Sequence, residues 1–281
     1  MKFSIIGPSG YIGHRHLEAI QNLEGSLLSY LDIKECNSID KNVPYYSKEE
    51  EFFSSFKVVK PNFCVICSPN YMHARQIIEC IDSGISVICE KPLCIKNEEL
   101  NHIEKKLKNS DAKLFSIMQL RLHPVLKEIK RISNSSDKNK EAKISVITPR
   151  DKDYLDSWKT KKEYSGGILF NLGIHYFDLL IQVFGNPSKS ELIYNEELKA
   201  KGATYFKDLK VEWYFSIDPE DQTNHKDAQR IFNINGEDIV FSSVPNDLHY
   251  ENYSKIISGD SNFDFYSILP TMEYILNLNE R

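Results

Sequence analysis

The chain has 281 residues, a length that favours two domains around separate cores. Its 35 basic and 40 acidic residues give a net charge of −5, without the concentrated basic block that nucleic acid binding needs. The longest apolar runs are far shorter than the roughly 20 residues of a membrane-spanning helix. We therefore expect a globular, cytoplasmic protein that acts on neither nucleic acid nor membrane.

Apolar, β-rich runs alternate with amphipathic stretches through the first third of the chain. The runs predict strands at 2–6, 27–32, 63–68, 86–90 and 113–118, and the stretches between them predict helices at 14–22, 71–83 and 97–109. Strands this apolar are typical of parallel sheets that are buried on both faces. The sequence therefore predicts an α/β fold whose N-terminal domain, 1–118, is a Rossmann-like, doubly wound parallel sheet.

The pattern changes after residue 124. Strands are predicted at 143–150, 189–195, 205–217, 229–235 and 237–243, with helices at 171–184, 248–258 and 265–278. Turn signals such as Asn235-Gly236 favour antiparallel pairing. Residues 119–281 are therefore expected to form an α+β domain with a mostly antiparallel sheet, and the biased segment 133–140 suggests a mobile loop.

All cysteines lie in or beside apolar segments of the first third. This distribution fits reduced, buried thiols better than disulfides, and no second cysteine pair supports a zinc site, so no metal is expected. The six are Cys36, Cys64, Cys67, Cys80, Cys89 and Cys94.

The first strand ends in a glycine-rich turn, Gly7-Pro8-Ser9-Gly10-Tyr11-Ile12-Gly13, that leads into a helix. Glycines let the backbone approach a pyrophosphate, and the helix N-terminus offers unpaired N–H groups. A purely structural turn is the alternative. Asp32, at the end of the second strand, could accept hydrogen bonds from the ribose hydroxyls of an adenosine and would repel a 2′-phosphate, which favours NAD over NADP.

Two further strands deliver polar residues at their carboxyl ends, where open parallel sheets bind ligands. Ser68-Pro69-Asn70 is followed by His73, whose alternative role is an ordinary helix-capping residue. Glu90-Lys91-Pro92 follows the next strand. Lys91 could stabilise a substrate alkoxide as hydride leaves, although a lysine there can also be a plain surface residue.

A second dense segment runs from Glu163 to Asp178 and contains a double glycine at 166–167. On a helix, Asn171 and His175 lie four residues apart and share one face. His175 could act as a general base for a hydroxyl proton, whereas most histidines on apolar helices are buried structural residues.

In this order and spacing, these segments resemble the Gfo/Idh/MocA oxidoreductases over nearly the whole chain. The resemblance implies NAD as cofactor, Lys91 and His175 as the proton-handling pair and Asn171 as a substrate-positioning residue. It places a further set of residues around NAD: Gly7, Ser9, Gly10, Tyr11, Ile12, Asp32, Ser68, Pro69, Asn70, His73, Glu90 and Lys91.

A closer resemblance is to the UDP-N-acetyl-2-amino-2-deoxyglucuronate 3-dehydrogenases of bacterial surface-polysaccharide synthesis. It is carried by Gly10-Tyr11-Ile12 with Arg15-His16, 67–71, 88–93, 119–121, Arg150 and 154–159. It implies oxidation of a sugar 3-hydroxyl on a UDP-sugar and allows 2-oxoglutarate as hydride acceptor. A homodimer or homotetramer is implied as well.

The same segments supply side chains suited to a sugar nucleotide. Cations could hold a diphosphate or a glucuronate carboxylate, and flat aromatic rings could cover a sugar or uracil. The predicted substrate-binding residues are Gln119, Arg121, Arg150, Tyr154, Trp158, Lys159 and Asn171.

Two features depart from the pattern of these relatives. Many of them have Asp where this chain has Asn171, so the choice of base between His175 and Lys91 stays open. The chain is also short after His175, which leaves C-terminal subunit contacts open. The alternatives are a dehydrogenase of another sugar or polyol, and a non-catalytic NAD-binding regulator.

Overall fold

A computed structural model describes residues 1–133, 140–222, 228–241 and 248–280. The chain forms two compact units. The first contains Met1–Ile117 and returns for the stretch from Leu248 to Leu269. The second begins at Met118 and takes up the chain again from Pro270. Each unit has its own sheet and its own core.

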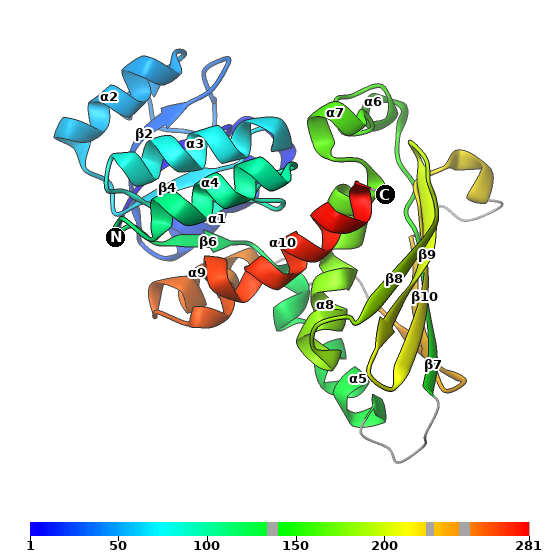
Figure 1. Ribbon diagram of the computed structural model, residues 1–281. Helices are drawn as coiled ribbons and strands as arrows, with labels where there is room; N and C mark the ends of the chain where they lie inside the picture. Colours follow the sequence, from blue (N-terminus) through cyan, green and yellow to red (C-terminus); the bar gives the residue numbers. More distant parts are fainter. Residues whose placement is uncertain (134–139, 223–227, 242–247, 281) are drawn as a thin grey trace. The chain divides into compact units, whose positions relative to one another are not determined.

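The first unit is built on a parallel sheet of six strands (Figure 1). Their order is β3-β2-β1-β4-β5-β6, so the direction of winding reverses between β1 and β4. Ligands of open parallel sheets bind at the carboxyl ends of the strands beside such a reversal. The strands are β1 (Lys2–Ile6), β2 (Ser26–Leu31), β3 (Tyr45–Tyr46), β4 (Phe63–Ile66), β5 (Ser86–Cys89) and β6 (Leu114–Ser116).

Helices connect these strands and bury their apolar faces, as α2 illustrates. Phe52, Phe53 and Phe56 form its buried side, and three glutamates occupy its first turn, where they complement the helix dipole. A fifth helix, α9, returns from the far end of the chain and packs against α1. The helices of this unit are α1 (Tyr11–Asn22), α2 (Glu49–Val59), α3 (Asn70–Asp82), α4 (Asn97–Leu107) and α9 (Leu248–Ile257), with the turn η4 (Ser261–Phe263) and the start of α10 (Phe265–Asn279).

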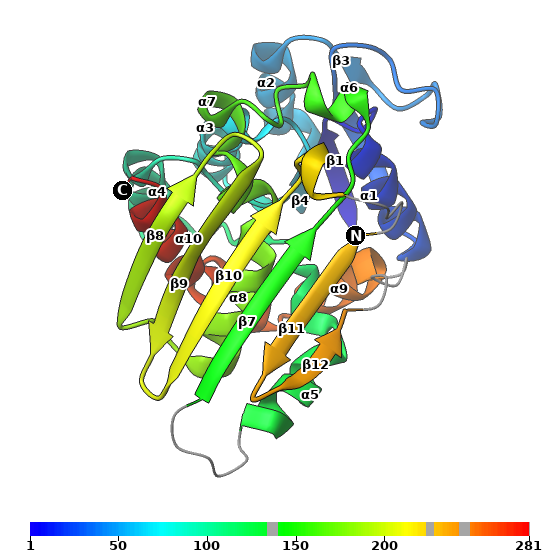
Figure 2. The ribbon, with the colours of Figure 1, turned by 90° about the vertical axis from the view of Figure 1, so that its right-hand side faces the viewer.

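The second unit is built on a six-stranded sheet of order β12-β11-β7-β10-β9-β8 (Figure 2). Neighbouring strands are antiparallel except β10 and β7, which pair in parallel. The strands are β7 (Lys140–Ile147), β8 (Lys189–Asn195), β9 (Lys199–Phe206), β10 (Leu209–Ser216), β11 (Gln229–Ile234) and β12 (Glu237–Val240).

Helix α8 (Ile174–Phe184) covers one face of this sheet. Alternate residues of β10 are buried, and Trp213 and Phe215 both pack edge-to-face against Phe177 of α8 at ring-centre distances of 5.3 Å. The rest of the unit consists of η1 (Gln119–Leu122), α5 (Val125–Ser133), α6 (Lys152–Leu155), α7 (Lys162–Ser165), η2 (Leu169–Gly173), η3 (Pro219–Asp221) and the end of α10.

One stretch, Lys162–Phe184, is long and apolar enough to cross a membrane by length and composition. Buried side chains make up 72% of its most apolar window, as in the core helix of a globular protein. The stretch therefore gives only weak support for a membrane span.

The expected fold class is confirmed, and all six cysteines are free and buried. The single strand expected at 205–217 was wrong, because β9 and β10 form a hairpin whose turn contains Lys207 and Asp208. Most of the loop expected at 133–140, and residues 242–243 of an expected strand, lie outside the described residues.

Candidate functional site

The glycine-rich turn after β1 lies against the backbone that follows β4. Gly7 has a φ of +78°, and a Cβ at this position would lie 2.9 Å from the carbonyl oxygen of Cys67. A Cβ at Gly13 would lie 2.5 Å from the carbonyl oxygen of Pro8. Because no side chain fits at either position, the backbone of the turn packs directly against the loop after β4 and against the start of α1. Helix α1 begins directly after Gly10, which offers no side-chain cap, so its first N–H groups suit a phosphate.

Asp32 connects this turn to the end of β2. Its Oδ2 accepts a hydrogen bond from the Ser9 N–H at 2.8 Å, and its Oδ1 accepts one from the Ile33 N–H at 2.7 Å. Each carboxylate oxygen can accept a second bond, for instance from a ribose hydroxyl. The Ser9 Oγ is buried and has no hydrogen-bond partner among the described residues. The glycine-rich turn before α1, the Asp32 carboxylate and the Ser9 hydroxyl are together suited to the phosphates and ribose of a dinucleotide cofactor.

His73 ties together two loops at the carboxyl edge of the sheet. Its Nδ1 lies 2.6 Å from the carbonyl oxygen of Pro92, and its Nε2 lies 2.8 Å from that of Ser68. Burial lowers the pKa of His73, while both carbonyl oxygens oppose that shift. The loop after β4 is further held by the Ser68 hydroxyl, which donates to Gln76 Oε1 at 2.5 Å. The segments predicted to surround the cofactor are thus brought together in the first unit.

Glu90 is the most tightly held of these residues. Its Oε1 lies 2.9 Å from His16 Nε2 and 3.4 Å from His249 Nε2, and its Oε2 accepts a bond from the Lys91 backbone N–H at 3.3 Å. Burial alone would raise the pKa of Glu90, but the hydrogen bonds from the two histidines hold it well below its ordinary value. His249 carries no sequence signal for this role, because no local pattern relates it to a strand in the first third of the chain.

In the second unit, the segment with Asn171 and His175 is not one regular α-helix. Asn171 lies in a π-helical turn, η2, and His175 lies in the first turn of α8. Both glycines before the turn have positive φ, and a Cβ at Gly166 would lie 2.6 Å from the Phe170 ring. π-Helical turns inside helices occur frequently at functional sites. The double glycine is therefore needed to start this turn.

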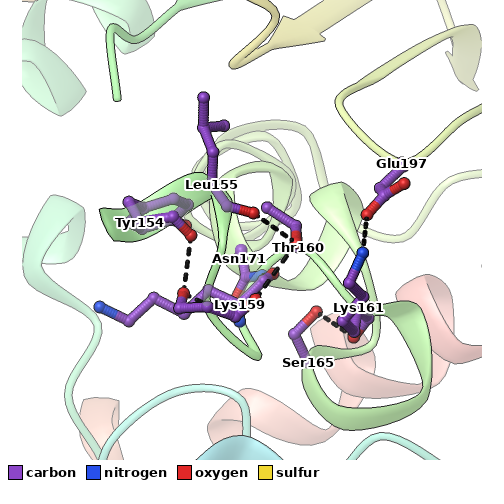
Figure 3. A network of polar contacts seen from close by, with 9 residues as sticks. Tyr154, Leu155, Lys159, Thr160, Lys161, Ser165, Asn171 and Glu197 are labelled. Carbon is purple, nitrogen blue, oxygen red and sulfur yellow. Dashed lines mark hydrogen bonds and ion pairs between the residues drawn. The ribbon is translucent and has the colours of Figure 1, made fainter. Parts of the chain in front are cut away.

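Asn171 reaches the loop that carries the predicted substrate residues (Figure 3). Its Nδ2 donates to the carbonyl oxygen of Lys159 at 2.5 Å. The neighbouring Thr160 hydroxyl donates to the Leu155 carbonyl at 3.1 Å, which holds the loop in a compact turn. Asn171 thus fixes the backbone of the loop from the side of η2.

Two cations lie close to the ring of Tyr154 in that loop. The guanidinium carbon of Arg150 lies 4.4 Å from the centre of the Tyr154 ring, and Lys159 Nζ lies 4.9 Å from it. Burial, followed by the charge of Arg150, lowers the pKa of Lys159. Two cations near one ring offer charge-assisted contacts to an anion, and the Asp151 carboxylate opposes part of the effect of Arg150 on the pKa of Lys159. Trp158 in the same loop is half-buried.

Arg121 lies in η1 and forms an ion pair with Asp178 of α8. Its side chain is only 4% exposed, and Thr271 also donates to the Asp178 carboxylate at 2.9 Å. Gln119, at the start of η1, is half-buried. Contact between Arg121 or Gln119 and a substrate stays a prediction.

Two family models match this chain, and together they include residues of both units. Residues 1–117 match the family described as "Oxidoreductase family, NAD-binding Rossmann fold" and residues 137–258 match its "C-terminal alpha/beta domain". The chain belongs to the Gfo/Idh/MocA oxidoreductase family. As a member, it has an NAD-binding Rossmann domain in residues 1–117. Contact of Gly7, Ser9 and Asp32 with the cofactor stays a prediction.

Two solved structures of one enzyme are similar over nearly the whole chain. They are of the WlbA (WbpB) dehydrogenase from Thermus thermophilus, in complex with NAD and alpha-ketoglutarate and in complex with NAD and UDP-GlcNAcA. Each has a TM-score of 0.91 and 28% identity, and the match covers 99% of this chain and 94% of theirs.

Among curated relatives, the myo-inositol 2-dehydrogenase of Thermotoga maritima is 25% identical over 66% of this chain. The D-glucoside 3-dehydrogenase of Escherichia coli is 26% identical over 46% of it. The matches span 55% and 38% of those two proteins. This chain therefore matches about half of such relatives or less.

Proposed function

We propose that the protein oxidises the 3-hydroxyl of UDP-N-acetylglucosaminuronic acid to a ketone with NAD, in the synthesis of a bacterial surface polysaccharide. Residues 1–118 are proposed as the NAD-binding domain, and 119–281 as the substrate-binding and oligomerisation domain of a homodimer or homotetramer, although the stretch from Leu248 to Leu269 belongs to the first compact unit. The observation that carries the proposal is the likeness, over 99% of this chain, to a dehydrogenase solved with NAD and UDP-GlcNAcA.

The charge around Tyr154 supports an anionic sugar nucleotide. Arg150 and Lys159 both lie within 5 Å of the Tyr154 ring centre, and the substrate carries a diphosphate and a carboxylate. The ring offers a flat apolar surface beside the two cations. Asn171 holds the Lys159 backbone, so it would order this loop for substrate binding.

Bound at the turn after β1, NAD would supply the acceptor for the hydride that leaves the sugar carbon. The residues of this chain must then remove the hydroxyl proton and balance the charge on the oxygen as it becomes a carbonyl. Lys91 and His175 are proposed for these two tasks, and which of them takes the proton stays open. Glu90, Asp32 and the turn at Gly7 would hold the cofactor in place.

The direct test incubates purified protein with NAD and UDP-N-acetylglucosaminuronic acid, with and without 2-oxoglutarate. NADH absorbance and mass spectrometry of the sugar nucleotide are both recorded. A keto product that lacks two hydrogens is expected. If product accumulates without NADH only when 2-oxoglutarate is present, the oxo acid takes the hydride and becomes 2-hydroxyglutarate, which regenerates NAD in place.

Matched variants connect the activity to the site. Lys91→Met and His175→Asn are each expected to lower kcat by at least about 100-fold, in line with the usual effect of acid–base groups. Lys105→Met and His102→Asn are the controls, because both residues are exposed on α4. The proposal fails if the wild-type protein binds NAD but yields no keto sugar nucleotide.

A second candidate is a dehydrogenase of a polyol or another sugar. The similarity to the myo-inositol 2-dehydrogenase of Thermotoga maritima favours it. Turnover of inositol or of an uncharged UDP-sugar at a higher kcat/KM than UDP-N-acetylglucosaminuronic acid would select this candidate.

A further inference from the structure

Four buried side chains from three distant segments meet behind the Glu90-Lys91 turn. His16 and Tyr253 are fully buried, and His249 and Glu90 expose 2% and 7% of their surface. His16 comes from α1, Glu90 follows β5, and His249 and Tyr253 lie one turn apart on α9.

The acceptors in this cluster determine where its protons lie. An ionised carboxylate only accepts hydrogen bonds, so the His16 Nε2, at 2.9 Å from Glu90 Oε1, must carry a proton and donate it. The neutral ring then leaves Nδ1 as an acceptor, and the Tyr253 O–H donates to it at 2.7 Å. The His249 Nε2 faces the same carboxylate oxygen at 3.4 Å and donates in the same way.

The second oxygen of the Glu90 carboxylate connects the cluster to the backbone of Lys91. Glu90 Oε2 accepts from the Lys91 backbone N–H at 3.3 Å. We propose that His16, His249 and Tyr253 are positioning residues that fix the Lys91 backbone through the Glu90 carboxylate. The inference rests on the proposed role of Lys91 in proton handling. It means that α9, from the far end of the chain, helps to build the reactive turn.

The same cluster has the composition of a metal site, since His16, Glu90 and His249 bring three ligand atoms within 4.8 Å of one another. Hydrogen bonding explains the geometry better. The 2.9 Å separation of His16 Nε2 and Glu90 Oε1 is a hydrogen-bond distance, and Tyr253 and the Lys91 N–H satisfy the atoms that face away from the shared oxygen.

The kinetic test compares His249→Leu with His249→Gln. Glutamine can place an N–H donor near the position of His Nε2, whereas leucine cannot. His249→Leu is expected to lower kcat about tenfold or more, with KM for NAD within about twofold, and His249→Gln to regain most of the loss. Equal losses in both variants, or a rise in KM for NAD with unchanged kcat, would contradict a positioning role. If His249→Leu does not fold, the isosteric Tyr253→Phe takes its place in the kinetic comparison.

A spectroscopic test does not depend on turnover. In protein with ¹⁵N-labelled histidine, the rings of His16 and His249 are expected in the form that carries the proton on Nε2. The buried His123, whose Nδ1 accepts from the Val125 N–H, gives a third signal of this form. Tyr253→Phe should shift the Nδ1 signal of His16 alone. The inference is wrong if Glu90→Gln and Tyr253→Phe leave every ring signal unchanged. It is equally wrong if elemental analysis finds one equivalent of metal in the wild-type protein and none in Glu90→Gln. If the wild-type protein is inactive but shows the expected ring signals, the proposed substrate is wrong and the hydrogen-bond network is supported.

Discussion

Arg121 and Asp178 form a two-pronged ion pair in the core of the second unit. The Arg121 Nε donates to Asp178 Oδ2 at 2.8 Å, and a terminal guanidinium nitrogen donates to Oδ1 at 2.5 Å. The two side chains expose only 4% and 1% of their surface. The pair joins η1 to α8 one turn beyond His175, so it anchors the helix that carries this proposed catalytic residue.

Removing one partner of this pair should cost far more stability than removing both. Arg121→Met leaves the Asp178 carboxylate buried without its cation, and we expect a loss of about 3–5 kcal/mol in the free energy of unfolding of the second unit. The double variant Arg121→Met/Asp178→Leu should recover part of that loss. Urea unfolding followed by tryptophan fluorescence measures it, because Trp158 and Trp213 are the two tryptophans of the chain and both lie in this unit. Additive losses in the double variant would contradict a coupled buried pair.

A comparison of two glycines in the first unit distinguishes the effect of close packing from that of backbone strain. Gly7 and Gly84 both have positive φ, but a Cβ at Gly84 would meet nothing within 4 Å, whereas one at Gly7 would lie 2.9 Å from a backbone oxygen. Gly84→Ala should therefore cost only the strain of about 1–2 kcal/mol. Gly7→Ala should cost more stability and weaken NAD binding by at least tenfold. Isothermal titration with NAD, together with denaturation curves, tests both variants; similar NAD affinities would show that the turn at Gly7 does not approach the cofactor.

Acid should destabilise the first unit in two steps. Burial lowers the pKa of His16 below its ordinary value of 6.5, so below that pH the unfolded chain binds a proton that the folded chain does not. The free energy of unfolding therefore falls as the pH drops through 6.5 toward the folded pKa. Glu90, whose pKa is held well below 4.5 by the two histidines despite its burial, adds a second fall below that value.

The variant His16→Gln isolates the first step. It removes the titrating ring while keeping a donor for Glu90, so the decrease in unfolding free energy between pH 7 and pH 5 should be smaller than in the wild type. The pKa of His73 is also lowered by burial, so the unfolding free energy of the variant still decreases somewhat as the pH falls. Urea unfolding followed by circular dichroism at several pH values measures both slopes. Identical slopes would mean that folding leaves the pKa of His16 at its ordinary value. A steeper fall in the variant than in the wild type would mean that His16 is protonated in the folded protein.

The parallel sheet was predictable because its strands are apolar throughout and end in recognisable turns. The position of Lys91 and Asp32 followed from the rule that parallel strands present their carboxyl ends at one edge. Helix α2 was overlooked, although its three phenylalanines lie on one face. The β9–β10 hairpin was missed because Lys207 and Asp208 give none of the usual glycine or asparagine signals of a tight turn.

The network behind Glu90 could not be predicted from the sequence. His16 and Tyr253 are 237 positions apart, and neither local periodicity nor spacing relates them. The π-helical turn at Asn171 was also out of reach, because its residues have the apolar pattern of an ordinary α-helix. Periodicity gives the face on which a side chain lies, whereas partners from distant elements depend on tertiary packing.

The return of α9 to the first unit has a consequence for synthesis on the ribosome. Domains generally fold as units as the chain emerges, N-terminal part first. When β1 to β6 have emerged, the segment with His249 and Tyr253 has still to be translated. The Glu90 carboxylate then lacks His249, one of its three hydrogen-bond partners, and His16 lacks Tyr253. The hydrogen bonds around the Glu90 carboxylate can therefore be completed only after α9 has been translated and has packed against α1.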